Sequence, residues 1–214
     1  MRWSLGVLVV FGACVPKLTS PGPPDLADWD CPDNQWECTK PPAEIADDGI
    51  TYGFFEGQTL PDGVLVDQNG DELKIWQLYG DVVLLDISTM WCVPCKKLAC
   101  YAEDTGNVYA PEGFTYITLL PQNVHGQTPS VEDLNVWASN YSLTSPVVSD
   151  EDGNYSFDAV PTGSYPTYVL TNSELVVQQR LESPSDPEIR IAIEQVLGIE
   201  HKDIEPVTVC GAEE

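Results

Sequence analysis

The stretch VLLDISTMWCVPCK, residues 83–96, decides the fold of this chain. It belongs to a continuous apolar run over residues 82–87 that is typical of a central strand buried on both faces. A helix is predicted to begin near Cys92 and to run to about Val108. Two cysteines three positions apart across a first helical turn are close enough to form one small disulfide ring. The stretch therefore predicts a strand, a dithiol and a helix in direct succession.

The two cysteines of this motif have different surroundings. Cys92 lies at the expected helix N-terminus, where unpaired backbone N–H groups and the positive end of the helix dipole stabilise a thiolate. Cys95 lies one turn further inside and is expected to be less exposed. Cys92 can therefore attack a partner disulfide, and Cys95 can resolve the mixed disulfide that forms.

Two other uses of the motif are a static structural disulfide and half of a zinc site. A zinc site needs a second pair of ligands, and the sequence has no second CxxC and no HxxxH. A redox-active dithiol is the favoured interpretation. It requires no metal and no organic cofactor, because the dithiol itself is the redox centre.

Asp86 interrupts the apolar strand that leads to the dithiol. A carboxylate left charged and unpaired among apolar residues costs several kcal/mol, so its pKa is expected to rise. We hypothesise that Asp86 takes the proton from Cys95 when the mixed disulfide resolves. The alternative is a carboxylate at a strand end that is hydrogen-bonded to the backbone.

Turn and cap signals place further elements around this strand. Asn69-Gly70 predicts the turn of a hairpin over residues 65–73. Ser130 and Asp133 have the spacing of a capping box, which predicts a helix through Tyr141.

The order of elements predicts the fold class. Asp186-Pro187 caps a last predicted helix over residues 188–197, and Gly198 ends it. Further strands are predicted over residues 114–120, 146–148, 167–170 and 175–181. Strands that alternate with helices in this order predict an α/β fold, a central mixed β-sheet flanked by helices on both faces.

The N-terminus has the features of an export signal over residues 1–13. Arg2 precedes a short apolar stretch, too short for a transmembrane helix, and small residues lead into Cys14. This arrangement resembles the lipobox of bacterial lipoproteins, in which the signal is cut before a cysteine that is then lipidated. A plain secretory signal or an uncleaved anchor is the alternative.

Residues 14–49 are rich in proline and lack apolar periodicity, which predicts an extended tether. Cys31 and Cys38 lie within it and are expected to form a local structural disulfide in an exported protein. Metal binding by this pair is the weaker alternative, because no histidine is near.

Three anchors over residues 50–200 resemble the thioredoxin superfamily, and the Trp91-Cys92-Val93-Pro94-Cys95 form is similar to membrane-anchored thiol-disulfide oxidoreductases of the TlpA/ResA type. The anchors are the CxxC motif, Asp86 six residues before Cys92, and Tyr165-Pro166-Thr167 before a strand. The resemblance implies a thioredoxin-like fold in which Pro166 is cis and shapes a substrate groove. It also implies that backbone groups of Tyr165 pair with the substrate, and we expect Trp91 and Thr167 in the same substrate-binding set.

Cys100 departs from this family, whose corresponding helix often has proline there. Of the seven cysteines, six remain after Cys14, and six allow 15 connectivities. The preferred set joins 92 to 95, 31 to 38 and 100 to 210. Cys100 could instead pair with a tether cysteine or act as a third redox thiol. Residues 201–214 are expected to form an acidic C-terminal tail.

The charge excludes some classes of partner. The 214 residues carry 34 acidic and 9 basic side chains, a formal net charge of −25. Binding to nucleic acid, or to anionic lipid through basic patches, needs clustered Lys and Arg, so neither is expected.

The predicted function is that of an exported, lipid-anchored thiol-disulfide oxidoreductase. The resemblance implies reduction of disulfides in exported proteins, with cytochrome c maturation as a candidate process and a membrane dithiol donor as the source of electrons. One alternative is a peroxiredoxin-like peroxidase, but Leu85 stands where that motif needs proline, and only Thr89 and Cys92 fit it. Another is a non-enzymatic binding lipoprotein with a static CxxC disulfide. The periplasm or the cell surface is the expected location.

Overall fold

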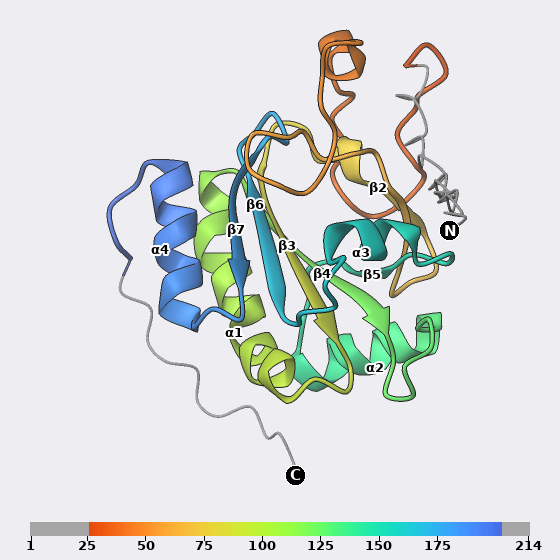
Figure 1. Cartoon of the computed structure of the whole chain (residues 1–214), viewed down its shortest axis with the longest axis vertical. Coiled ribbons are helices and arrows are strands. Elements are labelled where there is room, and N and C mark those ends of the chain that lie inside the picture. The colour runs from red at the N-terminus through yellow and green to blue at the C-terminus, as the bar shows by residue number, and fades with distance from the viewer. Residues whose placement is uncertain (1–25, 203–214) are drawn as a thin grey trace, which may run out of the picture.

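A computed structural model describes residues 26–202 and contains one seven-stranded sheet. The strand order is β2-β1-β5-β4-β3-β6-β7 (Figure 1). Strands β3, β4 and β5 run parallel, while β6 and β1 pair antiparallel with β3 and β5. The strands are β1 (Val64–Asp67), β2 (Glu72–Lys74), β3 (Val82–Thr89), β4 (Phe114–Gln122), β5 (Val147–Ser149), β6 (Thr167–Thr171) and β7 (Val177–Glu182).

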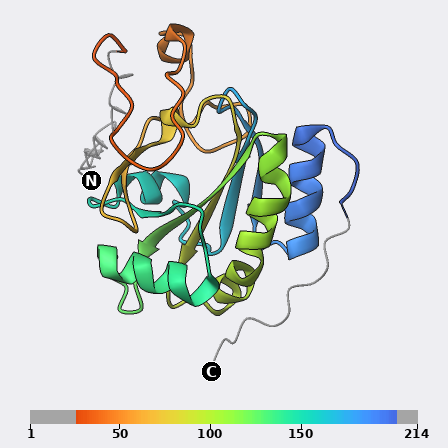
Figure 2. The same cartoon turned by 180° about the vertical axis from the view of Figure 1, so that it is seen from behind.

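Helices cover both faces of this sheet. The α-helices are α1 (Val93–Tyr109), α2 (Val131–Tyr141), α3 (Asn154–Ala159) and α4 (Asp186–Leu197), and short 3₁₀ helices span Ala43–Ala46, Ile75–Gln77 and Ala110–Glu112. Helices α1, α2 and α4 pack on one face, and α3 lies on the other with the chain that precedes β1 (Figure 2). The predicted α/β fold, with a mixed sheet between helices, is confirmed.

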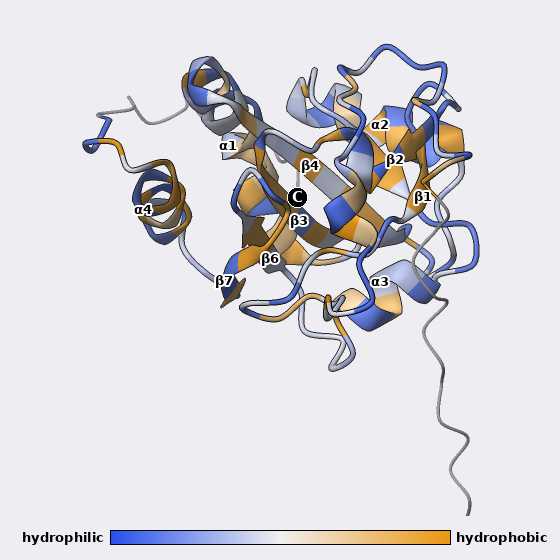
Figure 3. Ribbon diagram, turned by 90° about the horizontal axis from the view of Figure 1, so that it is seen from above, coloured by the Kyte–Doolittle hydropathy of each residue, from blue (hydrophilic) through white to orange (hydrophobic). Residues whose placement is uncertain are grey.

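Strand β3 lies in the middle of the sheet and is buried along its whole length. Because side chains alternate along a strand, Val82 and Leu84 join the cluster under α1, while Val83, Leu85 and Ile87 join the cluster on the opposite face. Figure 3 shows hydrophobic colour concentrated on the strands and hydrophilic colour on the connecting loops. The apolar run in the sequence therefore contributes side chains to the hydrophobic clusters on both faces of the sheet.

The helix caps explain where the helices around the site begin. Ser130 caps α2, and its side chain and that of Asp133 form the predicted capping box. Helix α4 starts at Asp186, with Ser185 as its N-cap and Glu188 completing the box, so the prediction that Asp186 caps this helix is wrong. The Glu188 carboxylate accepts hydrogen bonds from the backbone N–H and the hydroxyl of Ser185, both at 2.7 Å. Pro187 takes a position within the first turn, where its missing N–H costs nothing.

The described part of the predicted tether, residues 26–49, packs on the domain. Trp29 and Ile45 are buried in the cluster that contains Leu65 and Trp76. The indole Nε1 of Trp29 donates to Asp62 at 2.7 Å. In this region the segment differs from the extended spacer that its proline content predicts, because isolated aromatic side chains find partners far away in the sequence.

The short helix α3 has no counterpart among the elements predicted from the sequence. Asp150 accepts hydrogen bonds from the backbone N–H and the hydroxyl of Ser156, and these bonds fix the first turns of the helix. No helix formed by residues 26–202 is long and apolar enough to cross a membrane.

Candidate dithiol site

The two cysteines of the CxxC motif lie where β3 gives way to α1. Cys92 is the N-cap of α1, and Cys95 lies in its first turn. The pair forms a disulfide with Cα atoms 5.3 Å apart. The backbone N–H of Cys95 donates to Sγ of Cys92 at 3.2 Å. A helix-end donor therefore points at the sulfur expected to carry negative charge once the pair is reduced.

The residues that flank the cysteines are more exposed than the cysteines themselves. Cys92 is 4% exposed and Cys95 is fully buried, whereas Trp91 is 47% exposed. The indole Nε1 of Trp91 donates to the side chain of Gln122 at 2.9 Å, which holds the ring at the end of β4. Of the two cysteines, Cys92 is the more exposed.

The loop before β6 lies beside the motif. The rings of Trp91 and Tyr165 are 6.0 Å apart in an edge-to-face contact. The Tyr165–Pro166 peptide bond is cis, and Pro166 and Thr167 are buried. The Thr167 hydroxyl donates to the Ser164 carbonyl at 2.8 Å and closes the loop. The structure therefore brings Tyr165 against Trp91, the neighbour of Cys92, and Pro166 and Thr167 follow Tyr165 along the chain.

Asp86 is fully buried on the face of the sheet that α1 covers. Its carboxylate accepts a hydrogen bond from the Ser88 hydroxyl at 2.6 Å and from the Tyr116 hydroxyl at 3.0 Å. Burial raises the pKa of Asp86 to about 6, although the hydroxyls of Ser88, Tyr116 and Tyr168 act in the opposite direction. The group can therefore exchange a proton near neutral pH.

The hydroxyl partners of Asp86 were not predicted from the sequence. Tyr168 stands directly opposite Asp86 on β6, and Tyr116 lies on β4 opposite Leu84, two residues earlier on the same face. These neighbours depend on strand order and register, which connect positions far apart in the chain. The one local signal was Ser88, two residues from Asp86 and therefore on the same face of the strand.

Of the five cysteines outside the CxxC motif, the structure describes three. Cys31 and Cys38 form a disulfide within the segment that packs before β1. Cys100 lies on α1. Cys14 and Cys210 are outside the described residues, so the lipid site and the Cys100–Cys210 pairing stay predictions.

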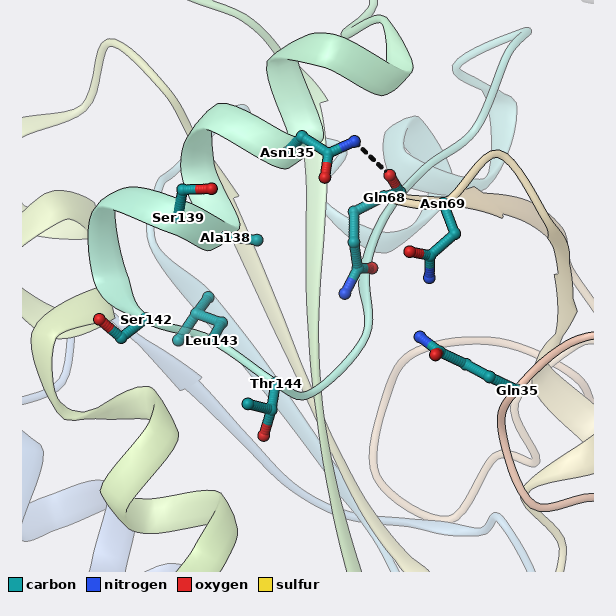
Figure 4. Close-up of a pocket in the computed structure, with 9 residues that line it drawn as sticks. All are labelled: Gln35, Gln68, Asn69, Asn135, Ala138, Ser139, Ser142, Leu143 and Thr144. Carbon is teal, nitrogen blue, oxygen red and sulfur yellow. Dashed lines mark hydrogen bonds between the residues drawn. The ribbon is translucent and has the colours of Figure 1, made fainter.

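A separate shallow pocket of about 480 Å³ lies between the C-terminal end of α2 and the β1–β2 turn (Figure 4). Its lining is uncharged and mostly polar, with Ala138 and Leu143 as the apolar members, and the Asn135 side chain donates to the Gln68 carbonyl. None of the predicted site residues contributes to it. Within residues 26–202, no group of three His, Cys, Asp or Glu side chains is placed to hold a metal ion.

Known proteins of similar sequence are named for dithiol chemistry. The thioredoxin-like protein YneN of Bacillus subtilis (strain 168) is 28% identical over 59% of this chain and 71% of its own length. The thiol-disulfide oxidoreductase ResA of Geobacillus kaustophilus (strain HTA426) is 31% identical over 58% of this chain and 67% of its own length.

Solved structures bear on the fold. A putative thiol:disulfide interchange protein DsbE from Chlorobium tepidum has a TM-score of 0.57 at 19% identity, covering 68% of this chain and 98% of its own. The thioredoxin domain of a thiol-disulfide oxidoreductase from Bacteroides vulgatus has a TM-score of 0.56 at 19% identity, covering 66% and 98%. The predicted thioredoxin-like fold is thus confirmed. A family model matches residues 57–180, and the chain belongs to that family, the AhpC/TSA family.

Proposed function

We propose that this protein is a thiol-disulfide oxidoreductase whose redox centre is the Cys92–Cys95 pair. The observation that carries the proposal is the position of Cys92 at the N-cap of α1, with the N–H of Cys95 directed at its sulfur. That donor and the helix dipole favour a thiolate at Cys92, the form that attacks a disulfide. The names of the YneN and ResA relatives support the same chemistry.

The reaction runs in two exchanges of sulfur. The Cys92 thiolate attacks one sulfur of a substrate disulfide, the substrate S–S bond breaks, and the other substrate sulfur leaves as a thiolate. Cys95 then loses its proton to Asp86 and attacks Sγ of Cys92. The Cys92–Cys95 bond forms, the second substrate sulfur leaves, and two electrons have passed from the enzyme to the substrate.

The burial of Asp86 supports its role as proton acceptor in the second exchange. With its pKa near 6, the ionised carboxylate is available at neutral pH and is still basic enough to hold a proton. Cys95 is fully buried in the cluster on the same face, so bulk water does not readily take its proton. We assign that proton to the Asp86 carboxylate, which lies on the face of β3 that α1 covers.

The proposal extends to substrate and location. The substrates are disulfide-bearing exported proteins, bound along Trp91, Tyr165, Pro166 and Thr167, and the direction is reduction. A signal over residues 1–13 directs export and is cut before Cys14, and a lipid on Cys14 then holds the protein at a membrane, facing the periplasm or the cell surface. A membrane dithiol donor returns the pair to the reduced state, and cytochrome c maturation is a process that needs such a reductant.

A trapping experiment tests the chemistry. In Cys95→Ala the second exchange cannot occur, so mixed disulfides through Cys92 should accumulate, and mass spectrometry of the adducts names the substrates. The matched control is the double variant Cys92→Ala/Cys95→Ala, which should trap nothing. If no Cys92-dependent adduct forms and the wild-type disulfide has a potential below about −300 mV, the pair is a static structural bridge and the proposal is wrong.

Activity assays on the wild-type protein distinguish disulfide reduction from peroxide reduction. Thr89, the hydroxyl of the alternative peroxidase motif, is fully buried in β3. We expect the reduced wild type to cleave insulin disulfides and to show no Cys92-dependent consumption of hydrogen peroxide. Peroxide turnover without disulfide cleavage would favour the peroxidase instead.

A further inference from the structure

The carboxyl group of Asp86 lies in a buried cluster of hydroxyl groups. Its neighbours on the same face are Ser88, Tyr116, Thr118 and Tyr168, and each of these side chains is at most 3% exposed. Ser88 and Tyr116 hydrogen-bond to the carboxylate, one on each oxygen. A core position beneath a dithiol therefore holds several donors around one acceptor.

Tyr168 completes this arrangement from the other side of β3. It is the register partner of Asp86 on β6, and its hydroxyl is buried without an aligned hydrogen-bond partner. The hydroxyl is still close enough for the charge of Asp86 to raise the pKa of Tyr168, together with burial. A buried hydroxyl without a hydrogen-bond partner destabilises the folded state. The Tyr168 hydroxyl is therefore stabilised most when the carboxylate beside it is ionised and attracts its proton.

Few other charged groups act on this cluster. Cys92 and Cys95 of α1 belong to the same buried cluster as Tyr116 and Tyr168. From α4, Asp186 acts on Tyr168 and is itself paired with Arg190 at 2.9 Å. Among the described residues, the direct partners of the Asp86 carboxylate are thus neutral hydroxyl donors, which favour its charged form over its protonated form.

We propose that Tyr116 and Tyr168 are positioning residues for closure of the dithiol, and that their hydroxyls keep Asp86 in the ionised form that accepts the proton from Cys95. This inference rests on the proposed function and assigns the pH range of its second step to two residues outside the CxxC motif. The tyrosine rings fill the core, but it is the hydroxyl groups that control the reaction. Replacement by phenylalanine keeps the ring and removes only the donor.

The test isolates the closure step. The reduced full-length protein is mixed with dithionitrobenzoate, which loads Cys92 with thionitrobenzoate. Cys95 then expels this group, and stopped-flow absorbance follows its release from pH 4.5 to 8.5. The variants are Tyr116→Phe and Tyr168→Phe. The matched control is Tyr109→Phe, because Tyr109 is also buried but donates to Glu194 on α4.

The wild-type rate is expected to fall on the acid side with a midpoint near pH 6. Loss of one hydrogen bond in Tyr116→Phe should move this midpoint upward by about one pH unit, which slows closure at pH 6 about fivefold and leaves it unchanged at pH 8.5. Tyr168→Phe should move it in the same direction by less, because its hydroxyl is not aligned. Tyr109→Phe should match the wild type.

A carboxyl carbon NMR titration of Asp86 in the same proteins provides a readout that does not depend on catalysis. Midpoints in Tyr116→Phe that equal those of the wild type would overturn the proposal, and so would an NMR shift without a matching kinetic shift. A failure of the proposed function looks different: the wild type would not cleave insulin disulfides. The thionitrobenzoate assay needs no protein substrate, so the two failures are distinguishable.

Discussion

Asp86 carries its carboxyl group inside the sheet, and this burial affects stability as well as chemistry. The unfolded chain ionises this group with a pKa of 3.8, and the folded protein ionises it with a pKa of about 6. Below about pH 3 both states hold the proton, so the group does not change the free energy of unfolding. Between about pH 3 and pH 7 the unfolded state loses the proton first, and stability falls by about 3 kcal/mol as pH rises.

Replacing this carboxyl group should therefore stabilise the protein at neutral pH. Asp86→Asn has no proton to lose, so its free energy of unfolding at pH 8 should exceed that of the wild type by about 2–3 kcal/mol. The gain should shrink to about 0.5 kcal/mol at pH 4, because the wild-type group is then protonated in the folded state and only about half ionised in the unfolded state. Urea denaturation of the oxidised proteins at the two pH values measures the difference.

An exposed carboxyl group provides the control for this experiment. Glu174 is exposed in the turn between β6 and β7, and Glu174→Gln should change stability by less than about 0.5 kcal/mol at either pH. An Asp86→Asn gain that is the same at pH 4 and pH 8 would contradict the argument, because repacking alone does not depend on pH.

At the scale of the elements, the cap of α2 tests how local sequence defines a helix. The Ser130 hydroxyl accepts from the N–H of Asp133, and the Asp133 carboxylate accepts from the N–H of Ser130. Ser130→Ala should lower the free energy of unfolding by about 1 kcal/mol, because a helix-end donor loses its acceptor. Ser139→Ala, an exposed position within the same helix, should be neutral or slightly stabilising. Thermal denaturation of the three proteins measures both effects, and equal destabilisation by the two changes would show that the cap has no special role.

Local signals predicted the elements that depend on neighbouring residues. Asn69-Gly70 predicted the hairpin because the turn requires positive φ, and Gly70 has φ of 84°. The apolar run around Leu84 predicted the central strand, because a strand that is buried on both faces has apolar side chains on both faces. Helix α3 was missed because it has six residues, and its stability comes from the buried Asp150 rather than from amphipathic periodicity.

Contacts between distant strands set the limit of what the sequence predicts at the site. Cys92, Cys95 and Asp86 could be found because they share one strand–helix unit of the chain. Tyr116 and Tyr168 could not, because each looks like an ordinary core aromatic until the register of β4 and β6 with β3 is known. The hydroxyl groups that surround the buried carboxyl group are therefore determined by how the strands of the sheet pair.

At the scale of the whole molecule, the chain before β1 is part of the folded unit. Thr39 forms a bridge with Leu78 shortly before β3 begins, and the Trp36 indole donates to Asp67 at 2.7 Å. Residues 26–49 lie toward the end of the sheet where β3 begins, and the dithiol lies where β3 ends (Figure 1). Stability contributed by this segment should therefore be separable from the chemistry of the site.

Trp29 provides the test of this separation. Its ring is 4% exposed, its Nε1 donates to Asp62, and the Lys74 ammonium lies 5.4 Å from the ring centroid. Trp29→Ala opens a cavity and leaves the half-buried Asp62 with one donor fewer, so the free energy of unfolding should fall by about 3 kcal/mol. The redox potential of the Cys92–Cys95 pair should stay the same.

The control is an exposed apolar position. Val136→Ala should alter stability by less than about 0.5 kcal/mol. A Trp29→Ala protein as stable as the wild type would mean that the segment is the extended tether its prolines suggest, because a spacer contributes nothing to the core.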